Sequence, residues 1–295
     1  MKPKPTFALP LLAMLAILAT QAPATSATPA DLVAAERAFA HDAAETGVRA
    51  SFLKWLSPRA VVFRPGPVNG PKSIAASKAT PAVLSWEPAY AALSDAGDLG
   101  WTTGPWSWRP ERSASHDQAW GEYLTLWRRQ PDGRYLAALD IGISHAKPGA
   151  PAGDPEYLAP AKPPHGRGPL DRRRSLWKAD AEFGHLAKQG GVAVALDRFG
   201  AERMILLREG LPRVVGRVAA CDTIRGHEQS ATLMSLAQFT ADSGDLGYTY
   251  GSFVRETMAG ADSGYYVHVW HRGAAKPWEL AVELVQPLPK PMKKK

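Results

Sequence analysis

The chain has 295 residues, 45% hydrophobic and 21% charged, which is enough for two ordinary globular domains and too apolar for a disordered protein. Its net charge of +7 would indicate nucleic-acid binding if it were spread over the folded surface. Six lysines near the two ends carry most of this charge and leave +1 for the rest, so nucleic acid is not expected as a partner.

The first predicted element is a secretory leader. Lys2 and Lys4 precede the uncharged stretch 7–20, and small-residue cleavage sites follow by residue 27. The stretch is shorter than the ~20 residues that span a membrane. We expect residues 1–27 to be a signal peptide, the protein to be periplasmic or secreted, and no membrane to remain as a partner after cleavage.

An internal repeat defines the domain organisation. Residues 95–104 read DAGDLGWTTG and residues 242–251 read DSGDLGYTYG, which are identical at seven of ten positions. The match extends over both flanks, at an offset of 144 residues before it and 143 after it. We therefore predict a domain at 30–146 (copy 1), a Pro/Gly-rich linker at 147–171, a second domain at 172–288 (copy 2) and a basic tail at 289–295.

Both copies have the same order of predicted elements. In copy 1, an amphipathic helix carries apolar residues at Leu32, Ala35, Phe39 and Ala43, and a second short helix carries Phe52. Helices followed by long strands predict an α+β unit, with one curved antiparallel sheet wrapped against the N-terminal helices. The strands and the helix that follow are expected at 60–64 (strand), 72–77 (helix), 83–95, 98–108, 118–129 and 134–144 (strands).

These patterns carry a family resemblance. The segments ERAFAHDAAETG, VVFRPGPVNG, WEPAYAALSDAGDLGWTTGPW and EYLTLWRRQPDGRYLAALDIG resemble the nuclear-transport-factor-2-like superfamily, in particular its SnoaL-like and ketosteroid-isomerase-like members and an exported bacterial domain of unknown function. The resemblance implies tandem cone-shaped domains, each with an apolar pocket at its open end. In active members, a carboxylate base on the sheet faces an acid or a tyrosine across the pocket. Because the superfamily includes enzymes, binders and associating domains, the resemblance does not assign chemistry.

Charged residues that recur in both copies are the first candidates for chemistry. Glu36 matches Asp180, Arg64 matches Arg208, and Asp140 matches Glu283. Read functionally, Asp140 is a general base, Arg64 an anion clamp and Glu36 its partner. Read structurally, the helix carboxylate pairs with the arginine that ends the first strand, and the strand carboxylate faces solvent. The recurrence favours the structural interpretation.

Histidine and motif searches add one further candidate. His268 is the histidine expected inside a pocket, at the position of Thr125 in copy 1, where it could act with Glu283 as a base; a core role remains the alternative. The sequence has no HExxH, phosphate-binding loop or GxGxxG pattern. We therefore expect no metal and no cofactor. The tentative catalytic set is Asp140, Glu283 and His268.

Tryptophans are concentrated in copy 1. Trp101 has the opposite strand parity to Trp106 and Trp108, so these side chains must emerge on both faces of one strand. Uncovered tryptophan implies either a ligand pocket or packing between the domains, and both remain open. The candidate ligand-binding residues are Glu36, Arg64, Trp86, Trp101, Tyr123 and Trp127.

The predicted function is binding of a small apolar or aromatic molecule, or of a protein partner, by an exported protein. The alternative is an isomerase, dehydratase or cyclase that uses a pocket carboxylate as its base. Because duplication supplies two sheet faces within one chain, we also predict a pseudo-two-fold intrachain dimer and a monomeric mature protein.

Overall fold

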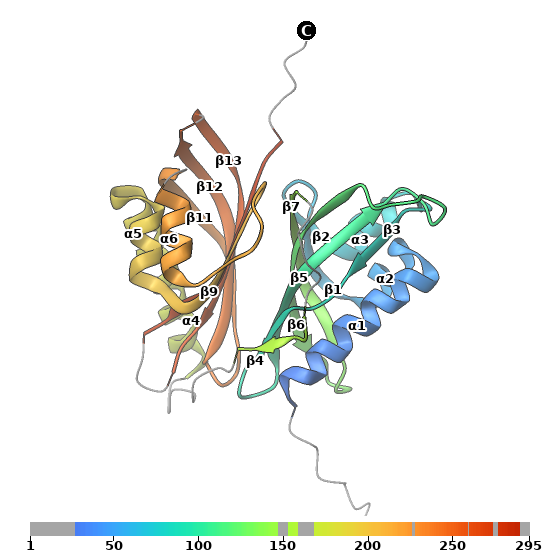
Figure 1. The fold of residues 1–295 in the computed structure, drawn as a ribbon. Coiled ribbons are helices and arrows are strands. Elements are labelled where there is room, and N and C mark those ends of the chain that lie inside the picture. Colours follow the sequence, from blue (N-terminus) through green and yellow to red (C-terminus); the bar gives the residue numbers. More distant parts are fainter. Residues whose placement is uncertain are drawn as a thin grey trace, which may run out of the picture.

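The structure is a computed structural model that describes residues 27–146, 153–158, 168–225, 228–258, 260–273 and 277–289. The predicted leader up to residue 26, parts of the linker and residues 290–295 of the basic tail lie outside the described residues. The described chain is α+β, with two separate sheets that face each other and helices on their outer sides (Figure 1). None of the helices in these ranges has the length and apolar character needed to cross a membrane.

Copy 1 builds the first sheet, in the strand order β2-β1-β7-β6-β5-β4-β8, with β3 paired to β5. Its first helix begins at Pro29 and ends before Gly47, whose φ of +88° is a conformation that favours glycine. The elements are α1 (Pro29–Thr46), α2 (Val48–Trp55), β1 (Leu56–Phe63), β2 (Pro67–Asn69), α3 (Gly70–Ala76), β3 (Val83–Trp86), β4 (Tyr90–Leu93), β5 (Leu99–Arg109), β6 (Ala119–Arg129), β7 (Tyr135–His145) and β8 (Glu156–Tyr157), the last within the predicted linker.

Copy 2 repeats this plan, with the strand order β10-β9-β14-β13-β12-β11. Gly191 ends its first helix with a φ of +91°, at the position that Gly47 has in copy 1. The elements are α4 (Pro169–Gly190), α5 (Val192–Phe199), β9 (Gly200–Arg208), β10 (Val214–Val215), α6 (Arg217–Arg225), β11 (Glu228–Thr240), β12 (Leu246–Thr257), β13 (Gly260–His271) and β14 (Glu279–Pro287).

The sheets differ from the expectation in two respects. They are not wholly antiparallel, because β1 runs parallel to β7 and β9 runs parallel to β14. No hairpin joins these pairs, and a long connection lets a strand enter the sheet in either direction. The strand expected at 83–95 is divided into β3 and β4 around Pro88, which has no N–H group to offer a neighbouring strand.

The inner faces of the two sheets form a shared hydrophobic core. Leu99, Trp101 and Leu126 of copy 1 pack there with Ile205 and Val269 of copy 2, and all five are almost fully buried. This core buries the faces that the two helical layers leave uncovered (Figure 1). Alternation along β5 places Trp101 in it, whereas Trp106 belongs to the core on the helical side.

The two repeated turns bind each other across this interface. The N–H of Asp95 donates to Oδ2 of Asp245 over 2.9 Å, and the N–H of Asp242 donates to Oδ2 of Asp98 over 3.0 Å. Each donor and each acceptor in copy 1 lies 147 residues before its counterpart in copy 2. The two contacts therefore reproduce each other under a pseudo-two-fold rotation.

Candidate functional site

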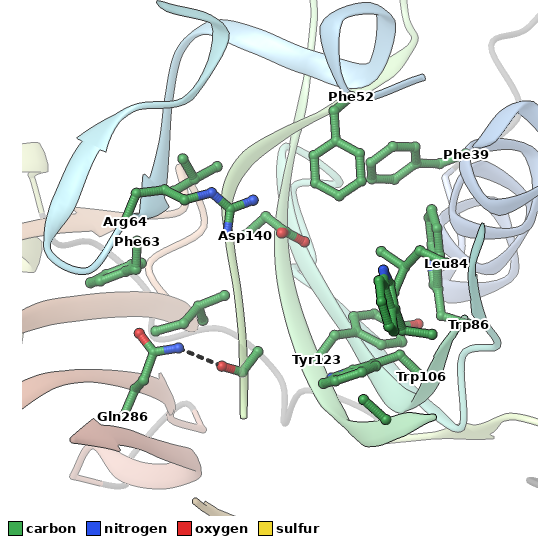
Figure 2. A pocket seen from close by; sticks show the side chains of 15 residues that line it. Phe39, Phe52, Phe63, Arg64, Leu84, Trp86, Trp106, Tyr123, Asp140 and Gln286 are labelled. Atoms are coloured by element: carbon green, nitrogen blue, oxygen red, sulfur yellow. Dashed lines mark hydrogen bonds between the residues drawn. The ribbon is translucent and has the colours of Figure 1, made fainter. Parts of the chain in front are cut away.

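A cavity of about 290 Å³ lies on the helical side of the copy 1 sheet. Its walls are mainly aromatic, with Phe39 from α1, Phe52 from α2, Trp86 from β3, Trp106 from β5 and Tyr123 from β6 (Figure 2). Gln286 of copy 2 also reaches this cavity, and its Nε2 donates to the carbonyl of Gly142 over 2.7 Å. Copy 2 therefore supplies part of the wall of the copy 1 cavity.

Two glycines make room for the Trp106 indole in this wall. A Cβ atom on Gly121 would lie 2.6 Å from the ring, and one on Gly142 would lie 3.3 Å from its Nε1. The ring is held by a hydrogen bond of 3.2 Å from Nε1 to the carbonyl of Ile143. The absence of side chains at two neighbouring strand positions thus lets the indole lie against the sheet and shape the cavity.

Glu36 lies behind the aromatic wall and is fully buried. Nε1 of Trp86 donates to its Oε1 over 2.5 Å, and the hydroxyl of Thr102 donates to its Oε2. Nε1 of Trp127 donates in turn to the Thr102 hydroxyl over 2.8 Å. Burial raises the pKa of Glu36 to about 7, although these hydrogen bonds oppose the shift. No cation pairs with this carboxyl among the described residues.

Asp140 lies in the cavity wall and is partly exposed to the cavity. It accepts a hydrogen bond of 3.0 Å from the hydroxyl of Thr125, and the Arg64 guanidinium points toward it (Figure 2). Burial raises the pKa of Asp140 to about 6, while Thr125 and Arg64 act in the opposite direction. The hydroxyl of Tyr123 is buried, and its pKa is raised by burial and by the nearby Glu36 carboxyl, against the effect of the neighbouring Thr102 hydroxyl.

The matching position in copy 2 is filled by a network of buried charges. Asp180 is bonded to Nδ1 of His268 over 2.8 Å, and it accepts from the hydroxyls of Thr249 (2.7 Å) and Tyr266 (3.0 Å). The other acid, Glu283, pairs through Oε1 with Nη2 of Arg208 over 3.0 Å and lies 3.6 Å from Nε2 of His268. The two acids and two bases are each at most 4% exposed.

Mutual attraction keeps this network charged. Burial opposes the ionised form of Glu283, but Arg208 and His268 outweigh it and lower the pKa to about 2. The pKa of Asp180 is also lowered, by His268 against the effect of burial. Burial acts against a charge on His268 as well, yet Asp180 and Glu283 raise its pKa above the ordinary value. Two opposite pairs thus leave the cluster neutral overall.

The recurring charges pair differently from the structural interpretation of the sequence. In copy 2 the strand arginine, Arg208, pairs with the strand acid Glu283, and the helix acid Asp180 pairs with His268. In copy 1 the helix acid Glu36 has tryptophan and threonine donors instead. The expectation of a helix–arginine pair was therefore wrong. The strand arginine approaches the strand acid because β1 lies beside β7, and β9 beside β14, in parallel.

The predicted site residues fall into three places. Arg64, Trp86, Tyr123 and Asp140 line the cavity, with Glu36 and Trp127 in the hydrogen-bonded layer behind it. Trp101 is 1% exposed and lies in the core between the two sheets, which is the domain-packing alternative rather than the ligand alternative. Glu283 and His268 lie in the closed network of copy 2.

Sequence reasoning left most of the cavity lining out of the ligand-binding set, including three of its aromatic residues, Phe39, Phe52 and Trp106. Phe39 and Phe52 were assigned only to helix packing, and Trp106 was not distinguished from its neighbours in β5. Strand alternation could have identified Trp106. It places Trp106 on the same face of β5 as Thr102, whose hydroxyl donates to Glu36. Within the described ranges, no cluster of three or more His, Cys, Asp or Glu side chains is arranged to hold a metal ion.

Comparisons with known proteins concern the fold. No family model matches the sequence, and no curated protein matches it. Among solved structures, a nuclear-transport-factor-2-like superfamily protein from Salmonella enterica is 9% identical, with a TM-score of 0.35, over 42% of this chain and 95% of its own. A Streptomyces avermitilis protein, provisionally named a dehydratase of the NTF2-like family, is 12% identical, with a TM-score of 0.34, over 41% of this chain and 99% of its own.

A third similar structure is a Novosphingobium aromaticivorans protein provisionally named an aromatic ring hydroxylase. It is 14% identical, with a TM-score of 0.36, over 42% of this chain and 94% of its own. Two of these three proteins, those from Salmonella enterica and Streptomyces avermitilis, carry the NTF2-like name. Each matches about two-fifths of the chain.

Proposed function

We propose that the chain is an exported protein that binds a small apolar or aromatic molecule in a cone-shaped pocket of copy 1. The observation that supports this proposal is the contrast between the copies. Copy 1 has an aromatic cavity with a half-buried carboxyl at its wall, whereas the same position in copy 2 is filled by mutually bonded side chains. Such a cavity with few polar groups is typical of small-molecule sites.

The lining indicates the class of ligand. A volume of about 290 Å³ is near the lower end for ligand pockets and suits a molecule with one or two rings. Trp106, Phe39 and Phe52 offer ring faces and edges, and we assign to the buried Tyr123 hydroxyl a hydrogen bond to a ligand oxygen. Arg64 and Asp140 offer charge at the same wall. The ligand is therefore an aromatic or fused-ring compound with a carbonyl or hydroxyl group.

Tryptophan fluorescence tests the proposal, because Trp86, Trp106 and Trp108 all line the cavity. Titration with one-ring and two-ring phenols and ketones is expected to quench or shift the emission of the full chain. Ala119→Phe places a ring in the cavity and should abolish the response. Failure of every compound, or an undiminished response in Ala119→Phe, contradicts the proposal.

A matched pair of variants locates the polar contact. Tyr123→Phe removes the proposed donor to the ligand and should weaken ligand binding about fivefold, the effect of one lost hydrogen bond. Tyr266→Phe makes the same change in copy 2, where the hydroxyl bonds Asp180, and should leave the affinity unchanged. Equal weakening by both variants would show that the effect is transmitted through the fold.

A second candidate function is isomerase or lyase chemistry in the same cavity. It is supported by Asp140, because a carboxyl with a pKa of about 6 is ionised at neutral pH yet basic enough to take a proton from carbon. Asp140 would remove a proton beside the ligand carbonyl, and the Tyr123 hydroxyl would stabilise the oxygen on which negative charge develops.

Proton exchange separates binding from catalysis. In D₂O, an enzyme of this kind would exchange the acidic C–H of a bound ketone, and NMR would follow the loss of that proton signal. Asp140→Asn should abolish exchange while the ligand still changes the tryptophan emission. If neither the wild type nor Asp140→Asn exchanges the proton of a bound ligand, the function is binding alone.

A further inference from the structure

A second hollow, distinct from the aromatic cavity, lies between the two copies. This cleft, of about 810 Å³, is formed by the start of β1 and the end of β6 on one side and by β11 and β12 on the other. Arg59, Arg128 and Arg129 line it, and none of the three forms an ion pair within the described residues. The carboxyl in the lining, Asp98, already accepts the N–H of Asp242.

The pseudo-two-fold rotation relates this cleft to a place in the same molecule that is already occupied. There, β8 from the linker lies parallel to the edge of β4. The N–H of Glu156 donates to the carbonyl of Ala89 and the N–H of Leu158 to that of Ala91, both over 2.9 Å. The Glu156 carboxylate pairs with Arg203, and Leu158 packs against the core between the sheets. An acidic residue, a spacer and an apolar residue thus fill the related position.

The residues of the cleft correspond to those that hold β8. Arg59 lies 144 residues before Arg203, the same offset that relates β1 to β9. Ala91 is paired with Thr102 in copy 1, and Gln238 with Thr249 in copy 2, with both partners 147 residues apart. Leu236 and Gln238 therefore stand where Ala89 and Ala91 present their carbonyl groups to β8.

The edge of β11 at Gln238 has no strand beside it in the part of the chain that the structure describes, because β11 ends the order of its sheet. Ala237 and Phe239 of this edge strand line the cleft, as do Tyr248 and Tyr250 of β12. The Arg128 guanidinium lies 4.0 Å from the centre of the Phe239 ring. The cleft thus combines an open strand edge, aromatic side chains and cationic groups.

We propose that this cleft binds an extended acidic peptide from a protein partner, which adds to β11 as a parallel strand in the way that β8 adds to β4. The peptide carries a carboxylate that pairs with Arg59 and, two residues later, an apolar side chain that packs against Phe239 and Tyr250. Its N–H groups donate to the carbonyls of Leu236 and Gln238. Strand addition supplies affinity through the main chain, and the pockets for side chains supply specificity.

The remaining segments of this chain have the wrong charge for the cleft. Residues 1–26, 147–152, 159–167 and 288–295 contain lysine, arginine or both, and none of them contains an aspartate or glutamate. A net surplus of arginine in the cleft would repel them. An acidic peptide from a protein partner complements the charge of the cleft better than these segments do.

The probe is a fluorescein-labelled peptide with the sequence Gly-Asp-Pro-Glu-Tyr-Leu, which copies residues 153–158. Fluorescence anisotropy with the full chain should show saturable binding that weakens as salt is added. Arg59→Glu should lower the affinity about tenfold or more, and a peptide with lysine in place of its glutamate should bind Arg59→Glu better than the wild type. Such a charge reversal distinguishes a direct pair from a loss of folding.

Methylation of the peptide backbone tests the strand geometry. Methylation of the leucine N–H removes the donor that corresponds to Leu158 and should abolish binding. The tyrosine N–H corresponds to that of Tyr157, which lies between the two donors and points away from the edge, so its methylation should leave binding nearly unchanged. Equal effects of the two methyl groups would refute strand addition.

Two other results would overturn the proposal. The first is the absence of binding to the wild-type chain at millimolar peptide. The second is binding that is unaffected by Arg59→Glu and is lost in Arg203→Glu, because the probe would then be displacing β8 from its own place rather than entering the cleft.

Discussion

Replacement of Glu36 by glutamine should make the protein less sensitive to alkaline pH. Glu36 is fully buried, and its pKa is raised from 4.5 to about 7 chiefly by burial. At about 1.4 kcal/mol for each pKa unit, ionisation of this group in the folded state costs about 3 kcal/mol. Glutamine has no charge to lose and can still accept the hydrogen bond from Trp86.

The direction of the pH effect follows from proton linkage. Between pH 4.5 and about 7, folded Glu36 keeps its proton while the unfolded chain has lost it. The folded state then binds more protons, so the free energy of unfolding falls as pH rises through this window. The contribution of Glu36 is complete below pH 4.5 and is lost above about pH 7.

Urea unfolding at intervals from pH 4.5 to pH 9 measures the effect. The wild type should lose about 3 kcal/mol relative to Glu36→Gln over this range, whatever the other groups contribute to both proteins. Asp180→Asn is the control in copy 2, because the pKa of Asp180 is lowered and its charge stabilises the fold at neutral pH. Parallel curves for the wild type and Glu36→Gln would refute the assignment of a raised pKa to Glu36.

Three further predictions concern the two copies and their contact. Glu283→Gln should lower the free energy of unfolding at pH 7 by about 3–5 kcal/mol, because it leaves the buried Arg208 charge without its carboxylate. Asp140→Asn should change the free energy of unfolding little, and equal losses for the two variants in urea unfolding would contradict this difference. Asp245→Ala should cost about 1–3 kcal/mol and speed hydrogen exchange at the Asp95 N–H, which it leaves without an acceptor; unchanged exchange would contradict the contact. Light scattering after size exclusion should give the mass of one chain, and a mass near twice that value would contradict the intrachain pairing of sheets.

Strand positions and faces were accessible to sequence reasoning because they depend on local pattern. The opposite parity of Trp101 and Trp106 predicted that the two rings leave β5 on opposite faces, and they do. The pairing of β1 with β7 was not accessible in this way. Alternation shows which face a residue occupies, but not which strand lies beside it or in which direction that strand runs.

The candidate site was less accessible, because its contacts join residues far apart in the sequence. Asp140 and Arg64 were identified from their recurrence in both copies, and both line the cavity. The partners of Glu36 could not be identified in that way, since Trp86 and Thr102 lie 50 and 66 residues from it and are brought to it only by the packing of α1 on the sheet. Whether each pocket is open or filled likewise depends on how side chains from distant parts of the sequence pack together.

The reciprocal contact between the repeated turns has a consequence for how the two copies can change. In a dimer of identical subunits, every substitution appears twice, so a change that closes one pocket also closes the other. Joining the subunits in one chain removes this coupling while the turns keep holding the halves together. One half can then become a scaffold, with the matching position filled by His268 and its ion pairs, while the other half keeps an aromatic cavity. Two copies within one chain thus permit a division of labour that a dimer of identical subunits does not.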